Sequence, residues 1–145
     1  MITPDHEILT QGQGWQSIFD CDKSDKLATV NLTSGKVEYQ SPTWSSEDLS
    51  ESDLFVLRHN RAELSCKPET KLIGKFSKTS AWQKLVCKNV KSVEFTMRLY
   101  LGEVIVKPIN MKVIPSTYTG SVFSPETSNG NYLVRKNDKI FLVAC

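Results

Sequence analysis

The sequence predicts an all-β protein, a single-domain antiparallel β-sandwich or partly open β-barrel. Short apolar segments rich in Val, Thr, Phe and Tyr alternate with period two, and turn residues interrupt them at roughly 8- to 12-residue intervals. Long helical patterns are scarce. A chain of 145 residues, 39% of them hydrophobic, can bury a core of its own. We therefore expect about nine to ten strands and one or two short helices, in one domain spanning residues 1–145.

Three hairpins are predicted from turn chemistry. They pair residues 27–32 with 36–40, 54–57 with 62–66, and 132–134 with 140–143. Two further strands are expected at 72–76 and 82–87. The clearest alternation lies in residues 93–101, and after a turn at Gly102 it continues through 104–107 and 109–113 until Pro115 ends it.

The sequence predicts little helix. The best candidate is residues 46–53, where Ser45 is a suitable N-cap and acidic residues stand near the positive end of the helix dipole. A second short helix is expected over residues 7–11. It would be short because Gly12 and Gly14 follow it and would end it. No apolar run approaches the roughly 20 residues of a membrane-spanning helix, so we expect no membrane partner.

The net charge of +2 is unevenly distributed along the chain. Residues 1–65 have a balance of −6, residues 66–112 of +7 and residues 113–145 of +1. The Lys-rich segment, residues 67–91, carries seven lysines against Glu69 alone, with Phe76 and Trp82 among them. Lysines beside exposed aromatic rings are typical of single-stranded nucleic-acid binding, although acidic and basic segments that face one another would explain the same pattern.

Cysteine usage leaves two interpretations open. Cys21, Cys66, Cys87 and Cys145 form no close pair, and the histidines are only His6 and His59, which argues against a zinc site. No signal peptide is visible at the start, so a cytoplasmic location with free thiols is expected. If a leader was removed, the protein would be secreted, with Cys66–Cys87 and Cys21–Cys145 disulfides.

No catalytic residues are predicted. His59 lies in an expected hairpin tip between two arginines, and His6 in a segment expected to fray, so both are interpreted as surface histidines and neither as a general base. The acidic clusters lack the apolar neighbours that raise a carboxyl pKa. Gly12 and Gly14 form no phosphate-binding motif, and we expect no metal and no cofactor.

The functional prediction is a non-enzymatic binding module for another macromolecule, most simply a protein partner, in the manner of interference or virus-encoded accessory factors. One alternative is a single-stranded nucleic-acid binder with an OB-like barrel that uses the Lys-rich segment. Another is a disulfide-bonded extracellular β domain. The predicted partner contacts are two groups of basic residues, at one hairpin tip and on the Lys-rich segment: Arg58, His59, Arg61, Lys75, Lys78, Lys84 and Lys88.

Overall fold

The computed structural model describes residues 1–59, 62–74, 81–89, 97–99, 104–106, 112–137 and 139–145, and confirms the all-β class. Within these ranges the chain forms β-strands and one short 3-10 helix. In chain order they are β1 (Glu7–Thr10), β2 (Gly14–Ser17), β3 (Leu27–Val30), β4 (Val37–Gln40), β5 (Thr43–His59), β6 (Ala62–Cys66), β7 (Lys71–Gly74), β8 (Gln83–Val86), η1 (Cys87–Asn89), β9 (Met97–Leu99), β10 (Val104–Val106), β11 (Lys112–Glu126), β12 (Asn131–Lys136) and β13 (Lys139–Ala144).

The largest sheet is antiparallel and carries most of the core. Its strand order is β4-β3-β1-β12-β13-β7-β8, with β2 paired to β1. Strand β12 begins with four consecutive buried residues, and β3 is buried throughout, because both faces of these central strands are covered. The largest buried side chains, Tyr132 and Phe141, come from β12 and its neighbour β13. This sheet is therefore the platform on which the rest of the chain packs.

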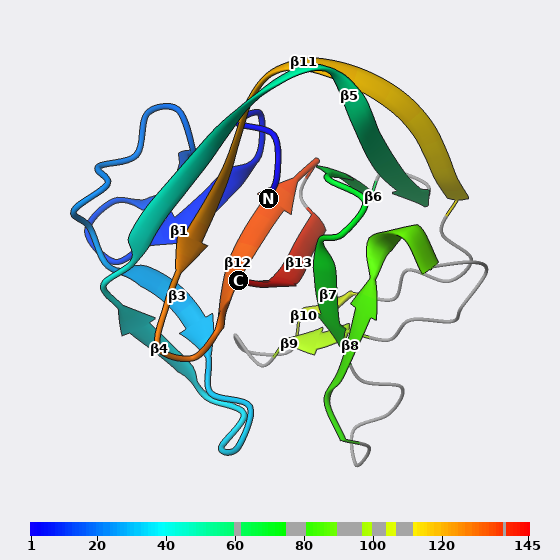
Figure 1. The fold of residues 1–145 in the computed structure, drawn as a ribbon. Helices are drawn as coiled ribbons and strands as arrows, with labels where there is room; N and C mark the ends of the chain where they lie inside the picture. Colours follow the sequence, from blue (N-terminus) through cyan, green and yellow to red (C-terminus); the bar gives the residue numbers. More distant parts are fainter. Residues whose placement is uncertain (60–61, 75–80, 90–96, 100–103, 107–111, 138) are drawn as a thin grey trace.

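Two long strands, β5 and β11, pair with each other and arch over the main sheet (Figure 1). Their register runs from Lys112 opposite Arg58 to Glu126 opposite Thr43, with one irregularity between Tyr118 and Gly120. Strand β6 pairs with the second half of β5, so the three-stranded sheet has the order β11-β5-β6. The curled sheets give the half-open barrel that the sequence predicts as one of two architectures.

Both predicted helices are wrong. Residues 46–53 belong to β5, and residues 7–10 form β1. The local capping signal at Ser45 is overruled because β11 offers a continuous ladder of backbone partners along β5. Leu49 and Leu54 are buried along the same strand, which adds apolar burial that an isolated two-turn helix could not obtain.

The predicted hairpins agree with the pairings β3–β4, β5–β6 and β12–β13. Pro115 does not end its strand, because β11 is at the edge of its sheet, where a missing N–H costs no ladder bond. Most of the predicted strand 93–101 lies outside the described residues. Among the described residues, no helix has the length and apolar character to cross a membrane.

The backbone conformation of Gly120, at the irregularity in the pairing of β5 with β11, can be tested by substitution. Its φ of +145° is outside the range that L-residues adopt, and an added Cβ would lie 2.8 Å from the Tyr118 hydroxyl oxygen. That hydroxyl cannot move freely, since it donates a hydrogen bond to the Ser121 carbonyl at 3.0 Å. We expect Gly120→Ala to lower the free energy of unfolding by about 2–3 kcal/mol in urea titrations.

The matched control is Gly35→Ala, at φ +74° with open space around the Cβ position, which should cost only about 1 kcal/mol. Equal losses at the two glycines would contradict this account of the irregularity in β11.

Candidate functional site

The two ends of the described chain meet at one pocket. Met1 and Cys145 both line a hollow of about 210 Å³, and Figure 1 shows the ends close together beside the main sheet. The segment between β6 and β7 supplies most of the remaining wall, with Ala144 from β13: Lys67, Glu69, Thr70, Lys71 and Ala144. The pocket thus combines backbone from one terminus with a thiol from the other.

Thr70 holds both backbone polar groups of Met1. The Met1 nitrogen donates to the Thr70 Oγ1 at 3.2 Å, and that hydroxyl donates to the Met1 carbonyl at 3.0 Å. The Lys67 backbone N–H donates to the same carbonyl at 3.1 Å. Burial lowers the pKa of the Met1 amino group below its ordinary value. We call Met1, Lys67 and Thr70 the Met1 clamp.

Ile2 sets the position of the Met1 clamp. It bridges Cys66 on one side and Phe123 on the other, in antiparallel geometry. Its N–H donates to the Phe123 carbonyl at 3.0 Å, and its carbonyl accepts from the Phe123 N–H at 2.9 Å. Since its side chain is fully buried, the first residues form a short rung between β6 and β11.

Cys145 contributes the thiol, and of the four cysteines it is the exposed one. Its backbone N–H donates to the Gly130 carbonyl at 3.0 Å, and its Sγ lies 3.8 Å from the Thr127 hydroxyl. Partial burial raises the pKa of this thiol, so the protonated form is favoured at neutral pH. A thiol becomes a strong nucleophile only as the thiolate.

A pair of thiols, Cys66 and Cys87, lies beside the Met1 clamp. The sulfurs of Cys66 and Cys87 are 3.2 Å apart, and both residues are fully buried. The Cys87 N–H donates to the Thr70 carbonyl at 2.7 Å. The contact with Cys66, together with burial, raises the pKa of the Cys87 thiol far above its ordinary value. Cys87 is therefore held as a neutral thiol.

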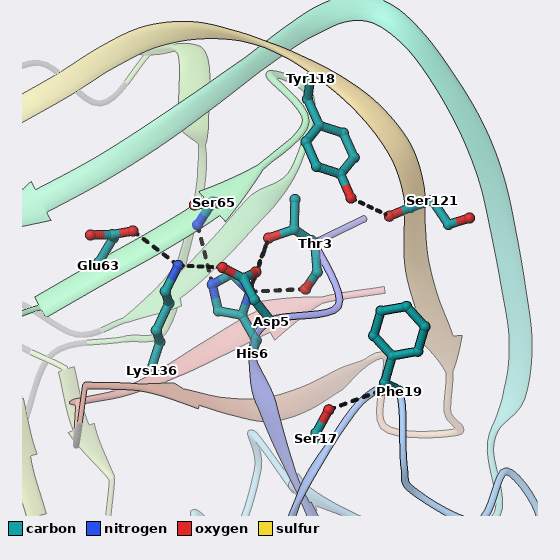
Figure 2. Close-up of polar contacts among 10 residues, drawn as sticks. All are labelled: Thr3, Asp5, His6, Ser17, Phe19, Glu63, Ser65, Tyr118, Ser121 and Lys136. Atoms are coloured by element: carbon teal, nitrogen blue, oxygen red, sulfur yellow. Dashed lines mark hydrogen bonds and ion pairs between the residues drawn. The ribbon is translucent and has the colours of Figure 1, made fainter.

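His6 anchors the segment that leads away from the Met1 clamp, as Figure 2 shows. It is fully buried; its Nδ1 lies 2.9 Å from the Thr3 carbonyl, and its Nε2 accepts from the Ser65 N–H at 3.2 Å. These roles place the proton on Nδ1. The interpretation of His6 as a surface histidine in a frayed segment is wrong, because the rung at Ile2 and the Ser65 bond hold that segment in place.

Around His6 lies a network of charges (Figure 2). The Lys136 ammonium contacts Asp5 at 2.6 Å and Glu63 at 2.9 Å. A hydrogen bond from His6, with further ones from Lys136 and Thr3, holds the pKa of the Asp5 carboxyl well below its usual range. Burial lowers the pKa of Lys136, but its bonds to the two carboxylates outweigh that effect and raise it. The network joins the first residues to β6 and β12.

The predicted partner contacts do not gather at this pocket. Arg58 is exposed on β5 and pairs with Glu63 at 3.1 Å, and His59 ends the same strand. Lys84 on β8 and Lys88 in η1 are exposed. Arg61, Lys75 and Lys78 lie outside the described residues. Their role in binding, the protein partner and single-stranded nucleic acid stay predictions.

Sequence reasoning missed the residues that form the pocket. Met1, Thr70 and Cys145 are far apart in sequence and carry no motif. The one signal was the even number of cysteines in the chain, which includes Cys145. Within the described ranges, no group of three or more His, Cys, Asp or Glu side chains could hold a metal ion. The chemistry available at the pocket is therefore that of one exposed thiol beside a clamped backbone.

The fold is that of inteins. The chain is similar to a splice-inactive variant of the AceL NrdHF class 3 split intein, with a TM-score of 0.77 and 10% identity over 99% of this chain and 95% of that one. It is similar to the transcription factor IIB Mvu mini-intein, with a TM-score of 0.75 and 8% identity over 100% of both chains. It is also similar to a bacterial intein-like domain from Clostridium thermocellum, with a TM-score of 0.74 and 13% identity over 99% and 97%. No protein-family model and no curated protein matches the sequence.

These similarities overturn the prediction of a non-enzymatic binding module and the viral-accessory interpretation. Binding of single-stranded nucleic acid by the Lys-rich segment and an extracellular location stay predictions. The statement that the protein is not an enzyme is wrong for the same reason, since the similar structures are protein-splicing domains, which process their own peptide bonds. The error has a physical cause. Strand periodicity and surface charge are visible in a sequence, but the approach of its two ends is a property of the folded chain.

The network around Asp5 gives a pH prediction. Its folded pKa lies below the unfolded value of about 3.9. The stability it contributes is therefore fully present above about pH 5 and is lost as pH falls toward the folded pKa. In urea titrations at several pH values, Asp5→Asn should destabilise the protein at pH 7, and the difference from the unmodified chain should shrink as pH falls to 3.

The control is Asp20→Asn, which removes the same charge from an exposed position outside the network of Asp5, Glu63 and Lys136. A difference for Asp5→Asn that stays constant with pH would show that the carboxylate charge is not what stabilises the network.

Proposed function

We propose that this chain is an intein-like self-processing domain that acts on the peptide bond joined to the Met1 nitrogen, with Cys145 as the nucleophile. The observation that carries the proposal is that the clamped Met1 backbone and the Cys145 thiol line one pocket. The intein fold supports it, because cutting or joining polypeptide at both ends of a domain requires the two ends to meet in one site.

The proposed step is an acyl transfer. When a polypeptide precedes Met1, the Cys145 sulfur attacks the carbonyl carbon of the preceding residue. The Cys145 thiol first loses its proton to solvent. A carbon–sulfur bond then forms, the bond from that carbon to the Met1 nitrogen breaks, and the released amino group takes a proton from solvent. The product is a thioester on Cys145, formed by an ordinary covalent route for a cysteine nucleophile.

The Met1 clamp prepares the peptide bond for this step. Thr70 accepts from the Met1 nitrogen, and Thr70 and Lys67 both donate to the Met1 carbonyl, so the nitrogen that leaves is fixed on one side of the pocket. Orienting a reacting group in this way converts much of the entropic cost of reaction into a cost of folding. Thr70 is thus a positioning residue in the proposal.

Two features limit the chemistry. Met1 has a thioether side chain, which cannot take an acyl group, so the nucleophile must come from elsewhere in the pocket. Ala144 has no side-chain amide to cleave the bond that follows it, and the similar AceL NrdHF structure is a splice-inactive variant in which one cysteine and one asparagine are alanine. We therefore propose transfer and cleavage at Met1, not the joining of two flanking segments.

The transfer should be reversible and slow. Burial lowers the pKa of the Met1 amino group, so the released amine is a competent nucleophile that can attack the thioester and restore the peptide bond. Neither histidine can serve as the base: His6 is occupied by Thr3 and Ser65, and His59 ends β5, a strand that contributes no residue to this pocket. Cys145 must therefore lose its proton to solvent.

The test uses a reporter domain fused before Met1 and incubated with hydroxylamine, which consumes thioesters. We expect release of the reporter as its hydroxamate, with a rate that rises about tenfold per pH unit from pH 7 to 9, since the thiolate is the reacting form. The raised pKa of Cys145 predicts no plateau at the ordinary cysteine value of about 8.5. Mass spectrometry identifies the product and the cut.

Cys145→Ala should abolish release. Cys21→Ala is the matched control, because Cys21 is buried away from the pocket lining, and it should release the reporter at the unmodified rate. Release that is unchanged in Cys145→Ala, or absent from every fusion at pH 9, would overturn the proposal.

Thr70 gives a second prediction for the same fusion. Thr70→Val removes both hydroxyl bonds to Met1 and should lower the release rate roughly 10- to 100-fold, at about 0.7–1.4 kcal/mol per lost bond. Thr70→Ser keeps the hydroxyl and should stay within about threefold of the unmodified rate. Urea titration of each variant confirms that the protein is folded, and equal rates in the two variants would remove Thr70 from the mechanism.

A further inference from the structure

We infer that Cys66 and Cys87 form a redox site, a buried dithiol that small-molecule disulfides convert to an intramolecular disulfide. The inference starts from selectivity. Their sulfurs are 3.2 Å apart, whereas Cys21 Sγ contacts the Lys23 ammonium and the Ile18 carbonyl, and Cys145 Sγ faces the Thr127 hydroxyl. Among the four cysteines, all of which lie in the described ranges, Cys66 and Cys87 are the pair with a sulfur–sulfur contact, and the Cys21–Cys145 pairing predicted from the sequence shows none.

The backbone on both sides of the pair is held by other contacts. Cys66 ends β6, where it pairs with Phe55 and bridges Ile2. Cys87 begins η1, and its N–H donates to the Thr70 carbonyl at 2.7 Å. A disulfide has a sulfur–sulfur length of about 2.05 Å, so the two sulfurs need to approach by roughly 1 Å. Rotation about the side-chain bonds can supply such a movement without breaking the β6 pairing.

The conversion is a two-step exchange with a low-molecular-weight disulfide such as oxidised glutathione. One protein thiolate attacks the reagent, giving a mixed disulfide and one glutathione thiol. The second protein thiol then displaces the other glutathione thiol, so the protein loses two electrons and two protons and the reagent gains them. Because both thiols are fully buried, the first step requires a transient opening of the contact between β6 and η1.

The bridge would close the loop that carries the Met1 clamp. Lys67 follows Cys66 directly, and the Thr70 carbonyl is bound by the Cys87 N–H. Cross-linking residues 66 and 87 reduces the conformational freedom of this loop in the unfolded chain, which stabilises the folded state. The inference rests on the sulfur geometry and not on the proposed acyl transfer, so its readouts are mass and stability, which a failure of reporter release would leave unchanged.

The experiment incubates the chain, without any fusion, in oxidised glutathione at pH 8, with and without a sub-denaturing concentration of urea. We expect a mass loss of about 2 Da, since two hydrogens leave, and a cross-linked peptide that contains Cys66 and Cys87. The bridge should form faster with urea and raise the melting temperature by roughly 5–10 °C. Dithiothreitol should reverse both changes.

Cys145→Ser should keep the bridge, and it removes the exposed thiol that would otherwise take up glutathione. Cys66→Ser and Cys87→Ala should each lose it, and two different replacements guard against one variant failing to fold. Glutathione adducts without the cross-link, a bridge to Cys21 or Cys145, or an unchanged melting temperature after bridging would overturn the inference.

Discussion

The insertion of the first residues between β6 and β11 is the interaction on which the rest of the site depends. Ile2 makes a rung with Cys66 and Phe123, and His6, fully buried, ties the following turn to Ser65. These contacts carry Met1 to the end of β13, where Cys145 stands. These contacts of Ile2 and His6 are what hold the backbone of Met1 near Cys145.

The long pair β5 and β11 makes this insertion feasible. The arch holds β6 and the second half of β11 at a separation that one extended segment can fill (Figure 1). The main sheet beneath supplies the buried apolar area, about 25 cal/mol per Å² removed from water, that offsets the entropy of ordering so many separate segments. The positions of Met1 and Cys145 at the pocket therefore depend on the burial of apolar side chains in the main sheet.

The electrostatics of the pocket favour neutral groups. Burial lowers the pKa of the Met1 amine and raises the pKa of the Cys145 thiol. The contact with Cys66, together with burial, raises the pKa of the Cys87 thiol. An uncharged amine and an uncharged thiol are compatible with a partly dry pocket, whereas a charged pair would need compensation. The charges near the first residues belong instead to the network of Asp5, Glu63 and Lys136, where each has a partner.

By itself the sequence determined the all-β class, the three hairpins and the approximate positions of β7 and β8, because period-two alternation and turn residues act over a few neighbouring positions. It misassigned residues 46–53 and 7–11 as helix, since caps and glycines are local signals that a distant strand can overrule: β11 pairs with β5, and β12 with β1. Only the tertiary structure decided the site. Met1, Thr70 and Cys145 are distant in sequence, and sheet pairing brings them together through hydrogen bonds that no local pattern encodes.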